Sequence, residues 1–262
     1  MSVSLDESET TGLLPVDWCE IRPEYFKVWA DFPLIAEPFG ITLSDHQLHA
    51  LGHMLVSMDL IDSAVDREPI QAVRNQLCKS VLRWMNDEKD LCHLPEQLNE
   101  DRLGKLRETI RRQNIKTAFL AAAENVFRAS ERKRNSLSAS ELIRHLVDEG
   151  QAAAEMTIQI LGSNTNAKLN RFLQRIMRIG TIVDTLLDAD EDFQQGILPL
   201  LPGRFFRLRL KSAIASQLPG LILGSPDRPL LWRYCLSYTR TEVVPLDLAR
   251  SKNGNEHVAQ KT

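Results

Sequence analysis

Residues 44–195 carry apolar side chains three and four positions apart, while proline and glycine are concentrated toward the two ends of the chain. This spacing is the period of an α-helix, which places such side chains on one face. Helix starts near 44 and 139 are indicated by Thr42-Leu-Ser-Asp45 and Ser138-Ala-Ser-Glu141, which have the spacing of capping boxes. The pattern therefore predicts an all-α chain. The expected helices are 44–66, 69–87, 99–132 with a candidate break at Asn114, 139–162, 166–194, 204–217 and 228–240.

The size of the chain indicates one large domain, because 262 residues, 43% of them apolar, can bury a sizeable core. Residues 1–15 and 251–262 lack apolar periodicity, so we expect both ends to be mobile and the helical domain to span 16–250. A formal net charge of -3 offers no general attraction to nucleic acid. The widely spaced cysteines, the acidic N-terminus and the lack of a long apolar run predict a soluble protein of the reducing cytoplasm.

The first of two aspartate-rich segments ends the helix expected over 44–66. Each residue advances about 100° around a helix axis. The residues that share one sector of this helix, roughly 80° wide, are Leu48, Leu51, Leu55, Asp59, Asp62 and Asp66. The acids thus continue an apolar face, where a carboxylate is costly unless it is paired or coordinates a metal. Either they rim an apolar cavity, or they lie on an exposed last turn beyond the core.

The second segment contains Asp184, Asp188 and Asp192, which recur every four residues on one helix side. Like charges at this spacing repel one another, and the C-terminal end of a helix favours cations. A cation should therefore compensate them. Magnesium is the best candidate, because it prefers hard oxygen ligands and commonly joins carboxylates to substrate phosphates. The alternative is a solvated acidic helix end.

Several short motifs resemble those of the class I isoprenoid synthase superfamily. The segment from Thr181 to Gly196, with two acids four apart and a glycine shortly after, is similar to a squalene and phytoene synthase pattern and to the second motif of polyprenyl diphosphate synthases. Glu149-Gly-Gln151 resembles a step of the polyprenyl branch, and Ala152-Ala-Ala154 is similar to a close-packed helix of the squalene branch. The resemblance covers roughly residues 44 to 199 and does not select a branch.

The resemblance implies a single-domain helical bundle around a central apolar cavity, acting on a prenyl diphosphate with Mg²⁺. The implied reaction is ionisation of an allylic prenyl diphosphate for prenyl transfer, head-to-head condensation or terpene cyclisation. The implied magnesium ligands are Asp59, Asp62, Asp66, Asp184, Asp188 and Asp192. Arg67 matches in kind a basic residue of the polyprenyl branch, which implies a diphosphate-binding role. Arg178 is a second candidate for diphosphate binding, because it lies on a basic ridge beside the second acidic face. The implied cavity residues are Leu48, Leu51, Leu55, Met177 and Thr181.

Departures from the family patterns leave a second class of function open. Met58 stands where the polyprenyl branch has the first of two adjacent acids. Leu187 and Ile197 stand where the squalene-type pattern often carries arginine. The alternative is a non-catalytic helical protein that retains the fold and binds an isoprenoid or a protein partner.

Two basic segments also have alternative interpretations. The run from Arg128 to Arg134 could bind phosphate or simply form the cationic end of a helix. Residues 202–211 alternate basic and apolar side chains, which fits either an amphipathic element in peripheral contact with a membrane or a cationic helix packed over the domain. The oligomeric state stays open, with a homodimer among the alternatives.

Overall fold

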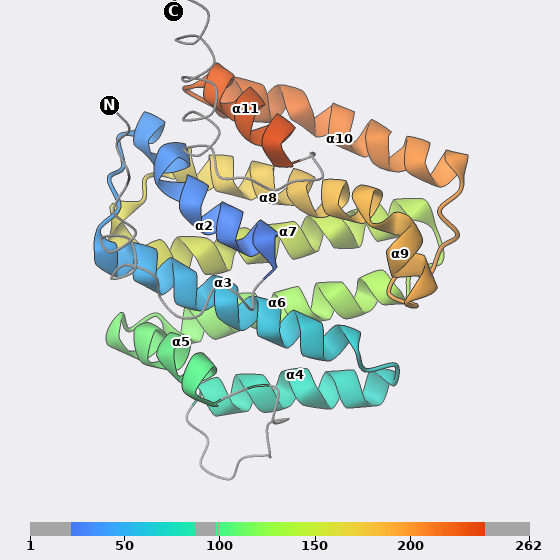
Figure 1. Ribbon diagram of the computed structural model, residues 1–262, viewed down its shortest axis with the longest axis horizontal. Helices are drawn as coiled ribbons and strands as arrows, with labels where there is room; N and C mark the ends of the chain where they lie inside the picture. The colour runs from blue at the N-terminus through green and yellow to red at the C-terminus, as the bar shows by residue number, and fades with distance from the viewer. Residues whose placement is uncertain (1–21, 87–97, 99, 239–262) are drawn as a thin grey trace, which may run out of the picture.

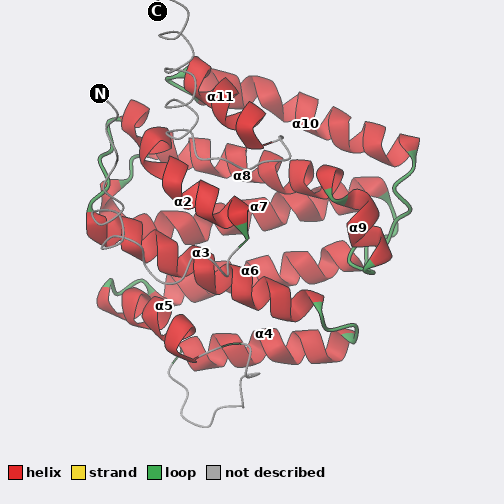
Figure 2. Cartoon of the chain, in the orientation of Figure 1, coloured by secondary structure: helices red, strands yellow, loops and turns green. Residues whose placement is uncertain are grey.

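The computed structural model describes residues 22–86, 98 and 100–238, and every regular element in these ranges is a helix (Figure 2). The all-α class is therefore confirmed for the described part of the chain. The predicted mobile ends, 1–15 and 251–262, lie outside it, as do both limits of the domain predicted over 16–250. The α-helices are α2 (Pro23–Ala36), α3 (Asp45–Asp66), α4 (Gln71–Met85), α5 (Glu100–Arg112), α6 (Lys116–Arg134), α7 (Ala139–Leu161), α8 (Ala167–Leu187), α9 (Ala189–Gln194), α10 (Arg204–Gly224) and α11 (Arg228–Tyr238).

Both predicted helix starts are confirmed, one of them with a different cap. The Ser44 hydroxyl accepts a hydrogen bond from the backbone N–H of Gln47, and the Gln47 side chain accepts one from the backbone N–H of Ser44. The capping box of α3 is therefore this pair, which satisfies two free N–H groups, and not Thr42 with Asp45. Ser138 caps α7 by accepting a hydrogen bond from the backbone N–H of Glu141, as expected.

The helices are arranged around α7, which packs against α6 on one side and α8 on the other (Figure 1). In this view α4 and α5 lie at one edge of the molecule, and α10 and α11 lie at the opposite edge. The largest hydrophobic core joins α2 through α8 and includes Leu51, Leu55, Trp84, Phe119 and Met156. The middle of the bundle is therefore filled with side chains. Within the described ranges, no helix is both long enough and apolar enough to cross a bilayer.

Two helices extend beyond the sequence prediction. Helix α2 was missed, although Pro23 at its first position is a favoured helix-start residue. Helix α10 continues to Gly224, seven residues past the predicted end at 217, and includes Pro219. Leu221 is 1% exposed in the core formed with α8 and α11, so this packing compensates for the hydrogen bond that proline removes.

The helix predicted over 166–194 is broken at Asp188, which separates α8 from α9 and has φ -95° and ψ 7°. Repulsion among acids four residues apart weakens a continuous helix here. The Arg207 guanidinium also donates a hydrogen bond of 3.2 Å to the carbonyl of Leu186 and forms a 2.7 Å ion pair with Asp190. These contacts hold the chain at the break. The candidate break at Asn114 is confirmed by its positive φ of 55°.

Helices α7 and α8 make a close contact at Gly150. A Cβ atom added to Gly150 would lie 2.5 Å from the carbonyl oxygen of Met177 and 2.7 Å from the Cα of Arg178. Both neighbours are backbone atoms, so neither can move without moving α8. This contact sets the position of Glu149 and Gln151 relative to α8.

Candidate functional site

Both aspartate segments lie at the same end of the bundle, where α3 and α8 finish and α9 begins (Figure 1). Asp59 is buried, whereas Asp62 and Asp66 are half-buried. Asp184 and Asp188 are exposed. The predicted metal ligands on the two segments are thus grouped at one end, with access to solvent.

Arg22, directly before α2, joins two acids of the first segment. Its Nε donates to Asp59 at 2.5 Å, and its Nη2 donates to Asp62 at 2.6 Å. The backbone N–H of Arg22 also donates to Asp59 at 3.3 Å, and the guanidinium lies 5.0 Å from the ring centre of Tyr25. Since Asp59 is 4% exposed, this arginine offsets the cost of burying its carboxylate.

The end of α6 supplies two further cations. Arg134 forms an ion pair with Asp66. Lys133 lies 3.3 Å from Glu149 of α7. Burial lowers the pKa of Lys133, but Glu149, Asp62 and Asp66 together raise it above its ordinary value. This lysine therefore stays charged among several carboxylates.

The second segment has raised carboxyl pKa values. Surrounding protein and the neighbouring Asp188 raise the pKa of Asp184 to about 7 from its ordinary 3.8, even though the side chain reaches water. Burial, with the charges of Asp188 and Asp66, raises the pKa of Asp192 to about 6. Lys133 acts in the opposite direction on both acids. The charges of the first segment and of α6 therefore shift the carboxyl pKa values of the second segment.

These mutual effects define one electrostatic cluster that is rich in carboxylates. Its carboxylates belong to Asp59, Asp62, Asp66, Glu149, Asp184, Asp188 and Asp192. Its cations belong to Arg22, Lys133 and Arg134. Among the described residues, these contacts and pKa effects link seven carboxylates from α3, α7, α8 and α9. Carboxylate oxygens are the ligands that Mg²⁺ prefers.

In this structure the acids do not surround a common position for a metal ion. Among the residues that the structure describes, no three His, Cys, Asp or Glu side chains are grouped so that they could hold a metal as they stand. Arg22 lies against Asp59 and Asp62, and Arg134 lies against Asp66. Ligation by these acids would require a metal to displace the protein's own cations.

The predicted diphosphate-binding residues lie in different settings. Arg67 is exposed at the C-terminal cap of α3. Arg178 is half-buried between α7 and α8, where it donates a hydrogen bond to Gln151. In this arrangement Arg178 joins the two helices, and its diphosphate role stays a prediction.

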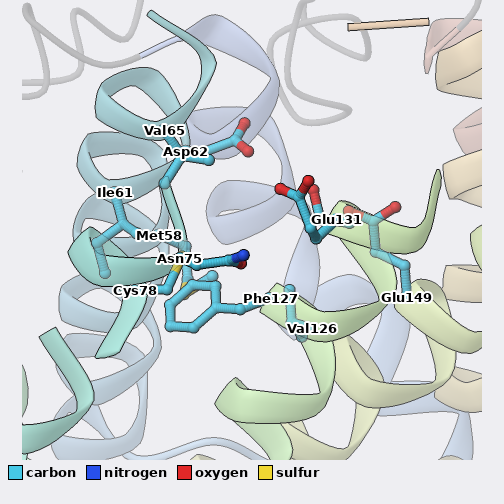
Figure 3. Close-up of a pocket in the computed structure, with 11 residues that line it drawn as sticks. Met58, Ile61, Asp62, Val65, Asn75, Cys78, Val126, Phe127, Glu131 and Glu149 are labelled. Atoms are coloured by element: carbon cyan, nitrogen blue, oxygen red, sulfur yellow. The ribbon is translucent and has the colours of Figure 1, made fainter. Parts of the chain in front are cut away.

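A cavity of about 30 Å³ lies between α3, α4, α6 and α7. Its lining includes Met58, Val126 and Phe127, with the carboxylates of Asp62 and Glu149 at its upper side (Figure 3). This volume holds roughly two water molecules. An apolar wall beside acids was expected, but this space is too small for a prenyl chain.

The predicted cavity residues do not line this space. Leu51 and Leu55 are buried in the largest core, and Leu48 is half-buried. Met177 contacts the hydroxyl of Thr157, while Thr181 donates a 2.8 Å hydrogen bond to the carbonyl of Leu146. Leu51, Leu55, Met177 and Thr181 thus pack against neighbouring helices in this structure.

Sequence reasoning missed Arg22 and left the basic run of α6 without a specific role. Arg22 is 37 residues from Asp59, so only the tertiary packing of α2 on α3 brings them together. The signal that could have indicated it was Pro23, which marks a helix start directly after the arginine. Lys133 and Arg134 belong to the run from Arg128 to Arg134, whose pattern also fits an ordinary cationic helix end.

Comparisons of the chain with protein-family models, with curated proteins and with solved structures found no match.

The raised pKa values predict how pH changes the stability of the metal-free protein. A raised carboxyl pKa means that the folded chain binds a proton more tightly than the unfolded chain. The stabilisation that this proton gives the folded state is therefore complete below about pH 4 and is lost as the pH rises to about 7. Because Asp184 reaches water, we expect the free energy of unfolding to fall by only on the order of 1 kcal/mol over this window. Urea unfolding in the presence of a metal chelator measures this change in the free energy of unfolding. Equal pH dependence in wild type and Asp184→Asn would contradict the assignment.

Proposed function

We propose that this chain is a magnesium-dependent class I isoprenoid biosynthesis enzyme that ionises an allylic prenyl diphosphate. The observation that carries the proposal is the acidic cluster, in which carboxylates from α3 and from α8 and α9 lie at one end of the bundle and act on one another. A group of carboxylates at a solvent-accessible bundle end suits several Mg²⁺ ions together with a diphosphate.

The chain's own residues would have two tasks in this reaction. Asp62 and Asp188, which reach solvent, would hold metal, and the displaced Arg22 would be free to bind diphosphate oxygens. Among the described residues, the Nε atoms of Arg134 and Arg178 are buried without a hydrogen-bond partner, so both retain a donor for such oxygens. When bound, magnesium neutralises the leaving diphosphate and so assists the break of the carbon–oxygen bond.

A prenyl substrate also needs an apolar space that excludes water from the allylic cation. The middle of the bundle is filled by core side chains such as Leu51 and Met156, and the cavity near Asp62 has only about 30 Å³. Substrate binding must therefore separate helices. Helix α2 is the candidate, because the metals would compete with Arg22, the residue that holds its start to α3.

The filled core and the ion pairs of the first segment also favour a second candidate function. A closed core and a first segment whose acids pair with Arg22 and Arg134 would suit a helical protein that keeps this architecture without ionising a substrate. Such a protein would bind an isoprenoid or a protein partner.

Diphosphate release separates the two candidates. Purified protein is incubated with farnesyl or geranylgeranyl diphosphate, with Mg²⁺ or with a chelator, and released diphosphate is measured. The enzyme proposal predicts release that requires Mg²⁺. A folded protein that releases none from any allylic substrate tested would contradict it and leave the non-catalytic candidate.

Competition between Arg22 and metal gives a separate prediction. We expect Arg22→Gln to tighten binding of Mn²⁺ alone about fivefold, because Asp59 and Asp62 lose a competing cation, while the free energy of unfolding falls by about 1 kcal/mol. Electron paramagnetic resonance of free Mn²⁺ measures the first effect. Arg111→Gln is a matched control, because Arg111 pairs with Glu108 on α5. Equal Mn²⁺ affinity in wild type and Arg22→Gln would argue against the competition.

A further inference from the structure

The segment formed by α10 and α11 has a charge opposite to that of the whole chain. Residues 201–238 contain six basic residues and one acid, Asp227, whereas the full chain has a formal net charge of -3. Helix α10 itself contains no acid. The two helices lie together at one edge of the molecule (Figure 1). A basic layer thus covers one side of an otherwise acidic protein.

The same layer exposes large apolar side chains. Half of the exposed large hydrophobic residues in the described part of the chain belong to it, namely Leu201, Phe205, Leu208, Leu223 and Trp232. Phe205 is 86% exposed and Leu223 is 76% exposed. Single exposed apolar residues are ordinary on protein surfaces, but five of them on one basic layer are not explained by chance exposure alone.

The geometry of α10 places Phe205, Leu208 and Leu223 on its outer face. Phe205 and Leu223 are 18 residues apart, which is five helical turns, so they point in the same direction. Phe206, Leu210 and Leu221 are buried on the opposite side. The outer apolar line is therefore separate from the face that packs on α8.

Basic side chains flank this outer line on both sides. At about 100° per residue, Arg204 and Lys211 lie on one side of the Phe205 direction, and Arg209 lies on the other. All three are exposed. Apolar side chains between flanking arginine and lysine residues are the arrangement of a helix that lies in the plane of a membrane surface.

We propose that the outer face of α10 and α11, called the basic apolar face, binds the surface of an anionic lipid membrane. Lipid phosphates would pair with Arg204, Arg209 and Lys211, while Phe205 and Leu208 would enter the boundary between headgroups and acyl chains. The positive charge of this layer complements the negative charge of an anionic lipid surface, whereas the rest of the chain is acidic and would be repelled by it. Binding by this face is independent of the proposed reaction.

Vesicle co-sedimentation of the full chain tests the proposal. We expect binding to vesicles of equal parts phosphatidylcholine and phosphatidylglycerol, little binding to phosphatidylcholine alone, and loss of binding at high salt. Reversal of two cations in Arg204→Glu/Arg209→Glu should weaken binding by at least about 25-fold. The matched control is Lys79→Glu/Lys105→Glu, which makes the same charge change on α4 and α5 and should retain most of the binding.

The apolar contribution is tested with Phe205→Ala/Leu208→Ala, which should weaken vesicle binding by about tenfold or more. Both side chains are exposed, so the variant should keep the circular dichroism and unfolding midpoint of wild type. Leu137→Ala, at a residue that is 89% exposed between α6 and α7, is its control. The proposal is overturned if wild type does not bind the anionic vesicles, or if the α10 variants bind as tightly as wild type. It is also overturned if Phe205→Ala/Leu208→Ala dissociates a dimer in size-exclusion chromatography and leaves vesicle binding unchanged.

Discussion

Asp62→Asn and Asp188→Asn are each expected to lower magnesium-dependent release of diphosphate from an allylic prenyl diphosphate by about 100-fold or more. Each change keeps the size of the side chain and removes an anionic oxygen ligand. Both side chains reach solvent, so the variants should fold as wild type does. Initial rates at saturating Mg²⁺, with unfolding midpoints measured in parallel, provide the comparison.

The control for this pair is Asp45→Asn, which removes one negative charge from the exposed first turn of α3. It should leave the rate within about twofold of wild type, because Asp45 is at the opposite end of the helix from Asp62. Wild-type rates in the Asp62→Asn or Asp188→Asn variants would show that these acids do not hold the metals.

Gly150→Ala is expected to destabilise the protein by about 2 to 4 kcal/mol. The new Cβ would lie 2.5 Å from the Met177 carbonyl oxygen and 2.8 Å from the Arg178 backbone nitrogen, so α7 and α8 must separate. Because Glu149 and Gln151 flank this glycine, their contacts with Lys133 and Arg178 should weaken as well. Urea unfolding gives the stability change, and diphosphate release gives the effect on the site.

Gly180→Ala is the matched control within α8, since no atom outside its own helical surroundings lies within 4 Å of the added Cβ. Alanine is a better helix former than glycine, so this variant should be as stable as wild type or up to about 1 kcal/mol more stable. Equal destabilisation by the two substitutions would contradict the close helix contact at Gly150.

Local signals predicted most of the helices. Apolar periodicity and the Thr42–Asp45 spacing placed α3 within one residue of its observed start, although the cap itself is Ser44, and Ser138 placed the start of α7. Helix α2 was missed, since a short segment with Pro33 inside it gives a weak periodic signal. The break at Asp188 depends on Arg207, which lies in a different helix. Periodicity carries no information about such a contact.

The aspartates of the candidate site could be predicted from the sequence, whereas the cations that pair with them could not. Helical spacing alone placed Asp59, Asp62 and Asp66 on one face, because that depends only on the helix period. The ion pairs of Arg22 with α3 and of Lys133 with Glu149 join residues on different helices, so they follow from packing. The filled core also depends on side-chain packing that the pattern of apolar residues does not specify.

Binding of Mn²⁺ with inorganic diphosphate tests most directly whether the two aspartate segments form one site. The measurement is a double-mutant cycle in which Mn²⁺ affinity is compared for wild type, Asp62→Asn, Asp188→Asn and the double variant. A shared site predicts tight binding by wild type, weakened binding in each single variant, and a coupling energy of about 1 kcal/mol or more between the two positions. Absence of Mn²⁺ binding by wild type, or strictly additive effects of the two substitutions, would contradict a site shared by α3 and the α8–α9 segment.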